Sequence, residues 1–137
     1  MSSLLIEQLT EKYHYPLIDE STLDEFLQTH HEAVLFFTEN PVRYPESNDV
    51  AVILPELMKL YGSRLAVAVV SREAEIAFKP RFGVRQWPSL VFVRDGEVLG
   101  VIGKVRNWDE YQLEIDRVLA GEARPMLNTI AAVNIAD

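Results

Sequence analysis

The 137-residue sequence contains no cysteine, and this absence removes several kinds of chemistry at once. Without cysteine there is no disulfide bond, no thiolate nucleophile and no cysteine-ligated zinc site. Long apolar runs are missing too. The N-terminus offers only Leu4–Ile6, far short of the roughly 18 apolar residues of a membrane span. We therefore expect no signal peptide, no direct membrane insertion and a cytoplasmic location.

Positive charge is also scarce, with 13 lysines and arginines against 21 aspartates and glutamates. The formal net charge of −8 at pH 7 argues against nucleic acid and anionic membranes as partners, because phosphates attract basic residues. The charge favours a basic protein partner, or serves solubility alone. The length is typical of one domain with a substantial core.

Apolar patterns and turn signals predict alternating strands and helices. The continuous apolar runs 33–38 and 65–71 are typical of strands covered on both faces, whereas 15–18 reads as an edge strand. Asp95 and Gly96 predict a hairpin turn within 89–103. Together with the helices below, this order predicts an α/β fold, in which a mixed central sheet carries helices on both faces.

Helix signals separate these strands. Helices are predicted over 3–12, from a capping box of Ser21 with Asp24, from a cap at Asn48 or Asp49, over 73–83, and from a capping box of Asn107 with Glu110. The last helix is expected to bury Trp108, Tyr111, Ile115, Val118 and Leu119. The domain is expected to cover 1–121, and residues 122–137 are expected to form a mobile tail because they show no clear period.

Three segments resemble, in order, the thioredoxin fold over roughly residues 15–120. VLFFTE (34–39) matches the strand before the active-site loop, and VILPEL (52–57) matches the helix kinked at Pro55. FGVRQWPSLVFVRDGEV (82–98) is similar to the segment that carries the cis-proline. The resemblance implies a thioredoxin-like fold with Pro88 in that role.

The resemblance also shows which chemical groups are absent. Ser47 and Val50 occupy the positions of the two redox cysteines, and Leu35 occupies that of the buried acid. Thiol–disulfide exchange needs a thiolate, so redox catalysis is excluded. A hydrolase or transferase that uses Ser47 is an alternative, but the resemblance places no histidine beside it as a base. We expect no enzyme, no cofactor and no metal, since the side chains of His30 and His31 diverge on a helix.

A narrower resemblance covers most of the chain. FFTENPVRYPESNDVAVILPEL (36–57) and RFGVRQWPSLVFVRDGEVLGVIGKVRNWDEY (81–111) are similar to the HyaE/HupG family of hydrogenase-accessory proteins. This similarity implies a chaperone that binds the twin-arginine signal peptide of the [NiFe] hydrogenase small-subunit precursor before export. A redox-inactive adaptor that bridges other hydrogenase maturation proteins is the alternative.

Such a signal peptide has a basic start and an apolar middle, so its binder needs carboxylates beside an apolar groove. The backbone beside the proline could capture an extended peptide as an added strand. The acidic run 19–32 is either a second contact or a solvated helix face. Asp49 could instead cap a helix, and Trp87 could pack in the core. The expected peptide site consists of Glu39, Glu46, Asp49, Glu56, Trp87 and Pro88.

Overall fold

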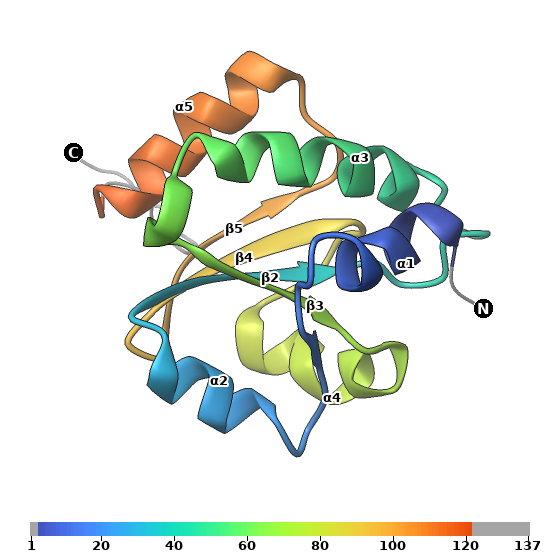
Figure 1. Ribbon diagram of the computed structural model, residues 1–137, viewed down its shortest axis with the longest axis horizontal. Coiled ribbons are helices and arrows are strands. Elements are labelled where there is room, and N and C mark those ends of the chain that lie inside the picture. The colour runs from blue at the N-terminus through green and yellow to red at the C-terminus, as the bar shows by residue number, and fades with distance from the viewer. Residues whose placement is uncertain (1–2, 122–137) are drawn as a thin grey trace.

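The computed structural model describes residues 3–121, so the tail predicted for 122–137 lies outside the described residues. Figure 1 shows a central sheet between two layers of helices. In chain order the elements are α1 (Leu4–Glu11), β1 (Leu17–Ile18), α2 (Leu23–Thr29), β2 (Glu32–Phe37), α3 (Glu46–Lys59), a 3₁₀ helix (Gly62–Arg64), β3 (Ala66–Val70), α4 (Arg72–Phe82), β4 (Ser89–Arg94), β5 (Glu97–Gly103) and α5 (Trp108–Leu119).

The five strands form one mixed sheet in the order β1-β3-β2-β4-β5, which confirms the predicted α/β architecture. β3 pairs in parallel with β1 and β2, whereas β4 is antiparallel to both β2 and β5. Every residue of β2 is buried, because this strand lies at the centre of the sheet. At the two edges, β1 has only two residues and β5 has an irregularity opposite Phe92 and Val93.

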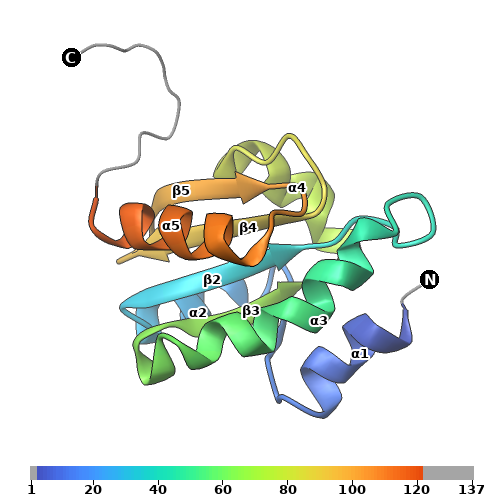
Figure 2. The same cartoon turned by 90° about the horizontal axis from the view of Figure 1, so that it is seen from above.

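Helices α1, α3 and α5 cover one face of the sheet, and α2 and α4 cover the other (Figure 1). Figure 2 views the first layer from above and shows α3 between α1 and α5. Each layer closes over its own apolar cluster, one around Phe36 and Phe92 and the other around Phe37 and Phe82. No helix within residues 3–121 combines the length and the apolar character needed to cross a bilayer.

The helix starts differ from the sequence prediction at two places. α3 begins at Glu46 after Pro45, and not at a cap on Asn48 or Asp49. Proline fixes φ near the helical value and lacks the N–H that a first turn leaves unsatisfied, so it starts a helix without a side-chain cap. Asp49 is therefore an exposed residue of the first turns of α3.

The capping box predicted for Ser21 and Asp24 is also wrong. Thr22 precedes α2 and makes no side-chain cap. Instead, the carboxylate of Asp19 accepts hydrogen bonds from both the N–H and the hydroxyl of Ser21, at 2.8 and 2.6 Å. Asp19 stabilises this turn because its short side chain bonds to the backbone two residues on, as in an Asx turn.

The start of α5 confirms one prediction and corrects another. Asn107 and Glu110 form the predicted capping box. Trp108 was expected among the buried residues of this helix, but it is 40% exposed, whereas Tyr111 and Ile115 are fully buried. As the first residue of the helix, Trp108 lies at the border of the buried stripe. α5 thus presents a large aromatic side chain to solvent.

Candidate functional site

The two positions that the thioredoxin-like resemblance assigns to redox cysteines are buried in the first turns of α3. Ser47 donates a hydrogen bond of 2.6 Å from its hydroxyl to the carbonyl oxygen of Thr38, at the end of β2. Val50 packs in the core beneath α3. The Ser47 hydroxyl is fully buried, so it fastens α3 to the sheet and presents no nucleophile to solvent.

A buried carboxylate holds the turn that follows β2. Glu75, on α4, accepts hydrogen bonds of 3.0 Å from the N–H groups of Thr38 and Glu39. Burial raises the pKa of Glu75, while these backbone hydrogen bonds act in the opposite direction. No local signal in the sequence indicates this role, because α3 and β3 separate Glu75 from the turn along the chain. The anchored turn sets the path of the loop that leads into α3.

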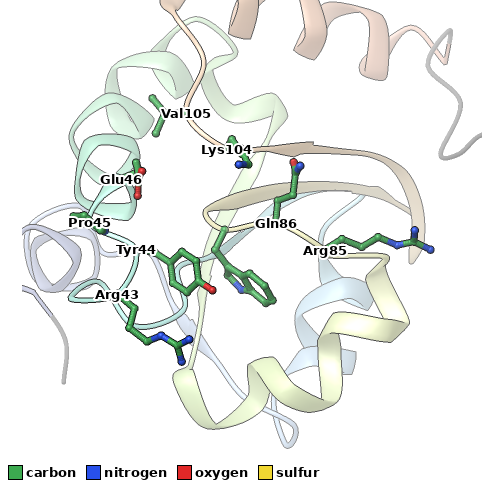
Figure 3. A pocket seen from close by; sticks show the side chains of 9 residues that line it. Arg43, Tyr44, Pro45, Glu46, Arg85, Gln86, Lys104 and Val105 are labelled. Carbon is green, nitrogen blue, oxygen red and sulfur yellow. The ribbon is translucent and has the colours of Figure 1, made fainter.

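A pocket of about 660 Å³ lies where this loop, the start of α3, the segment before β4 and the end of β5 meet (Figure 3). We call it the Trp87 pocket. Trp87 and Tyr44 contact each other there with ring centroids 5.6 Å apart. The peptide bond between Trp87 and Pro88 is cis, as the resemblance implies. The pocket's lining residues are Arg43, Tyr44, Pro45, Glu46, Arg85, Gln86, Trp87, Lys104 and Val105.

The charge of the Trp87 pocket is opposite to the expected one. Three of its lining residues are cations, Arg43, Arg85 and Lys104, and a fourth cation, Lys79, lies 5.0 Å from the Trp87 ring centroid. Among the described residues that line the pocket, Glu46 supplies the only carboxylate. The predicted groove flanked by carboxylates is therefore not found at this position.

None of these four cations forms an ion pair with another residue of 3–121, which sets them apart from many others in the protein. Twelve lysines and arginines lie within residues 3–121, and six of them form ion pairs: Lys59, Arg64, Arg72, Arg81, Arg94 and Arg106. The six without an ion pair in this part of the chain are Lys12, Arg43, Lys79, Arg85, Lys104 and Arg117. Four of those six surround Trp87, in a protein whose net charge is −8.

The structure distributes the six predicted site residues over three places. Glu46 and Trp87 line the pocket, and Pro88 is buried next to it, where its carbonyl accepts a hydrogen bond of 2.7 Å from the N–H of Lys104. Glu39 turns away and pairs with Arg72 at 3.0 Å. Asp49 and Glu56 lie further along α3. The sequence could not separate these places, because α3 carries its residues about 1.5 Å further from the pocket with each step.

Asp49 and Glu56 belong to a second exposed surface, formed by α3 and α5, which we call the α3–α5 surface. Carboxylates lie there beside large apolar side chains; Val52, Leu60 and Leu113 are more than half exposed. Soluble proteins seldom expose many such side chains together unless they bind something. Its members are Asp49, Val52, Glu56 and Leu60 from α3 and its C-cap, and Trp108, Asp109, Leu113 and Asp116 from α5.

A hydrogen bond ties the two helices of this surface together. The hydroxyl of Tyr61, just beyond α3, donates to a carboxylate oxygen of Asp116 on α5 at 2.9 Å. Burial, followed by this hydrogen bond, raises the pKa of Tyr61 to about 12. The phenol therefore remains protonated and keeps donating throughout the neutral range, which fixes the ends of the helices side by side.

Three carboxylates of the acidic run 19–32 interact within the fold, whereas Glu20 and Glu25 are exposed. Asp19 stabilises its own turn, and Asp24 lies 3.5 Å from Arg81. Glu32 is buried between two arginines, Arg64 and Arg94. Among residues 3–121, no group of three or more histidine, aspartate or glutamate side chains is placed to hold a metal ion.

The sheet order, the cis-proline and the buried Ser47 together define a thioredoxin-like domain without the groups for thiol chemistry. A mutant thioredoxin from Halobacterium salinarum NRC-1 has the same fold, with a TM-score of 0.62 and 18% identity over 83% of this chain and 92% of that one.

Sequence comparison places the chain more narrowly. The model of the family "Hydrogenase-1 expression protein HyaE" matches residues 5–111. The hydrogenase expression/formation protein HupG of Rhizobium leguminosarum bv. viciae is 43% identical over 94% of this chain and 89% of its own length. The crystal structure of a HupG chain from Rhodopseudomonas palustris CGA009 is 42% identical, with a TM-score of 0.55 over 80% of this chain and 99% of that one. The chain belongs to the HyaE family of hydrogenase expression proteins.

Proposed function

We propose that this protein is a non-catalytic chaperone of [NiFe] hydrogenase maturation that binds the twin-arginine signal peptide of the small-subunit precursor in the cytoplasm, before export. Membership of the family ties the chain to hydrogenase expression and formation. The observation that carries the binding role is the α3–α5 surface, where exposed apolar side chains lie beside carboxylates. A basic and apolar peptide needs this combination.

The charges of α3 suit an arginine pair. The carboxylate of Asp49 has no ion-pair or hydrogen-bond partner within residues 3–121, and the carboxylate of Glu56 has only the exposed Lys59 at 3.2 Å. An arginine guanidinium binds a carboxylate through two parallel hydrogen bonds, which lysine cannot do. The apolar part of the signal peptide would then pack on Val52, Leu60 and Trp108, where burial of apolar area contributes about 25 cal/mol per Å².

An extended segment of the same precursor, outside the signal peptide, would reach the Trp87 pocket. Glu46 lies at the pocket and begins α3, so the pocket and the α3–α5 surface are continuous along this helix. Nothing within residues 3–121 hydrogen-bonds to the main-chain N–H or C=O of Trp87, which precedes β4. Free main-chain groups beside a strand suit capture of a peptide by strand addition, a mode that requires no cysteine.

Calorimetric titration with a synthetic twin-arginine signal peptide tests this proposal. Replacing Asp49→Asn together with Glu56→Gln should weaken binding about tenfold, the equivalent of about 1.4 kcal/mol for two exposed charge pairs. The matched control is Glu20→Gln with Glu25→Gln, which removes the same charge from exposed positions at and before α2. Peptides with Lys-Lys or Ala-Ala in place of the arginines should bind progressively more weakly. No binding, or equal binding of the Ala-Ala peptide, would contradict the proposal.

An adaptor that bridges other maturation proteins is a second candidate, because the protein presents two surfaces of opposite charge. Such an adaptor would bind two proteins at once. Affinity capture from anaerobically grown cells, followed by cross-linking, separates the two functions. A complex that holds two maturation proteins and no small-subunit precursor would favour the adaptor.

A further inference from the structure

We propose that the Trp87 pocket binds an extended acidic peptide segment, whose carboxylates pair with Lys104, Arg43 and Arg85. The inference rests on the proposed function in one respect, namely that this segment belongs to the same hydrogenase precursor. The charge of the pocket indicates an acidic ligand, whereas a twin-arginine motif is basic.

The first argument is the distribution of charge. The protein pairs half of the lysines and arginines of residues 3–121 with carboxylates, yet it leaves four cations unpaired around one aromatic residue. Like charges that gather without counter-charges repel one another, and they raise the local concentration of anions. Such a cluster in a protein of net charge −8 indicates that an anionic group completes it.

The second argument is the arrangement of the cations. Figure 3 shows Lys104 between Glu46 and Gln86, with Arg43 and Arg85 extending at opposite sides of the pocket. The positive charges are therefore spread along the pocket and do not converge on one point. An extended peptide presents every second side chain to the same face, so successive acidic residues can each meet a different cation.

The third argument separates a peptide from a phosphate group. Helix N-termini bind phosphate through free N–H groups. Here, however, Pro45 has no N–H, and the N–H groups of Ser47 and Asn48 already donate to the carbonyls of Tyr44 and Pro45, both at 3.0 Å. What the pocket leaves free is the main chain of Trp87, which suits a peptide backbone.

The pocket therefore discriminates within one precursor. Its cations repel an arginine pair, and the carboxylates of the α3–α5 surface repel an acidic segment. Placing a repulsive charge at each wrong site is an effective way to fix the direction of a bound peptide. We infer that the acidic segment enters the pocket while the arginine pair lies along α3.

Intrinsic fluorescence can test this directly, because the sequence has two tryptophans, Trp87 and Trp108. Trp108→Phe leaves Trp87 as the only reporter, and it lines the pocket. The probes are the capped pentapeptide Gly-Glu-Leu-Glu-Gly and its analogues with Gln or Lys in place of both Glu residues. We expect the Glu peptide to change Trp87 emission saturably, the Gln peptide to bind at least fivefold more weakly, and the Lys peptide not to bind.

A charge-matched pair of variants then locates the site. Arg85→Gln with Lys104→Gln should lower the affinity for the Glu peptide at least fivefold. Lys12→Gln with Arg117→Gln removes the same charge from two cations outside the pocket that have no ion pair within residues 3–121, and should lower it less than twofold. Three results would each overturn the inference. The two double variants could lose the same affinity for the Glu peptide, or the Gln peptide could bind as tightly as the Glu peptide. The third is displacement of the Glu peptide by millimolar inorganic phosphate.

The outcome is independent of the test of the signal peptide. Asp49→Asn with Glu56→Gln should leave binding of the Glu peptide unchanged, whereas the pocket variants should leave the arginine dependence of signal-peptide binding intact. If the Glu peptide binds and the signal peptide does not, the proposed function fails and the pocket assignment stands. If the signal peptide binds and the Glu peptide does not, the pocket assignment fails and the proposed function stands.

Discussion

Ser47 and Thr38 are joined by a hydrogen bond of 2.6 Å from a fully buried hydroxyl to a main-chain carbonyl. The bond links the start of α3 to the end of β2, at the point where thioredoxins carry their redox motif. In this protein the position contributes to the rigidity of the scaffold. The surfaces on either side of it, the Trp87 pocket and the α3–α5 surface, are held in place as a result.

Replacement of Ser47 by alanine should therefore affect stability and leave function intact. The carbonyl of Thr38 would lose its buried donor, at a cost of about 1–2 kcal/mol in the free energy of unfolding. Urea denaturation measures the loss, with the exposed Ser63→Ala as control. Hydrogenase formation in a strain that depends on this protein should continue; its abolition by a folded Ser47→Ala protein would point to a catalytic serine.

Glu75 should give the protein a pH dependence of unusual sign. Burial raises the pKa of Glu75 above the ordinary value of 4.5, so the folded state holds its proton at a pH where the unfolded state has released it. Stability from this group is present below about pH 4.5 and is lost as the pH rises through the folded pKa. Urea midpoints measured at increasing pH should fall for the natural protein relative to Glu75→Gln. If the difference in urea midpoint between the two proteins does not change as the pH is raised from below 4.5, this expectation is refuted.

Glu32 should act in the opposite direction. Its carboxylate accepts a hydrogen bond of 2.7 Å from Arg64 and one of 2.8 Å from Arg94. The hydrogen bond from Arg64 contributes most to lowering the pKa of Glu32 below its ordinary value of 4.5. The stability from this group is therefore present above about pH 4.5 and is lost as the pH falls through the folded pKa.

We expect Glu32→Gln to cost about 2 kcal/mol at pH 7. That is less than the roughly 3–5 kcal/mol of a fully buried ion pair, because Arg64 is half-exposed. The gap between the two proteins should close under acid conditions, and urea denaturation at neutral and acid pH measures it. A gap that widens in acid would show that Glu32 is not ionised in the folded state.

Gly103 offers a way to disturb the Trp87 pocket without changing its charge. A methyl group at this position would collide with the side chain of Gln86, which lines the pocket. Gly103→Ala should displace Gln86 and weaken binding of the Glu peptide by at least twofold, with little effect on the signal peptide. The double variant Gly103→Ala with Gln86→Ala removes the closest contacts and leaves only the Cβ of residue 86, 3.2 Å from the added methyl group, so its fold should be nearly as stable as that of Gln86→Ala alone. Thermal unfolding and the Trp87 titration together check both expectations.

Much of the fold was predictable because its signals are local. Asp95 and Gly96 adopt positive φ angles of 51° and 82° in the hairpin, as an Asp-Gly turn requires. Asn107 and Glu110 meet each other across a single helical turn. The sequence predicts the wrong start for α3 because Asn48 and Asp49 are residue types that cap helices. Pro45 starts the helix instead, since its ring fixes φ near the helical value and it has no N–H to satisfy.

The pocket was not predictable, because its charges come from distant segments. Arg43, Arg85 and Lys104 belong to three loops that only the sheet brings together. The net charge of −8 pointed to the opposite sign, since the basic residues are outnumbered along the chain as a whole. The resemblance to thioredoxins supplied the three-dimensional context of Trp87, whereas Glu46 was predicted for its carboxylate alone, and both line the pocket.

The two edges of the sheet also affect the tendency of the protein to aggregate when no partner is bound. β1 offers two residues and follows Pro16, which cannot donate a main-chain hydrogen bond, and β5 is interrupted opposite Phe92 and Val93. Neither edge is a long, flat template for a strand from another molecule, so edge-to-edge aggregation is discouraged. Although the protein exposes apolar side chains on the α3–α5 surface, its sheet edges therefore do not promote polymerisation while no partner is bound.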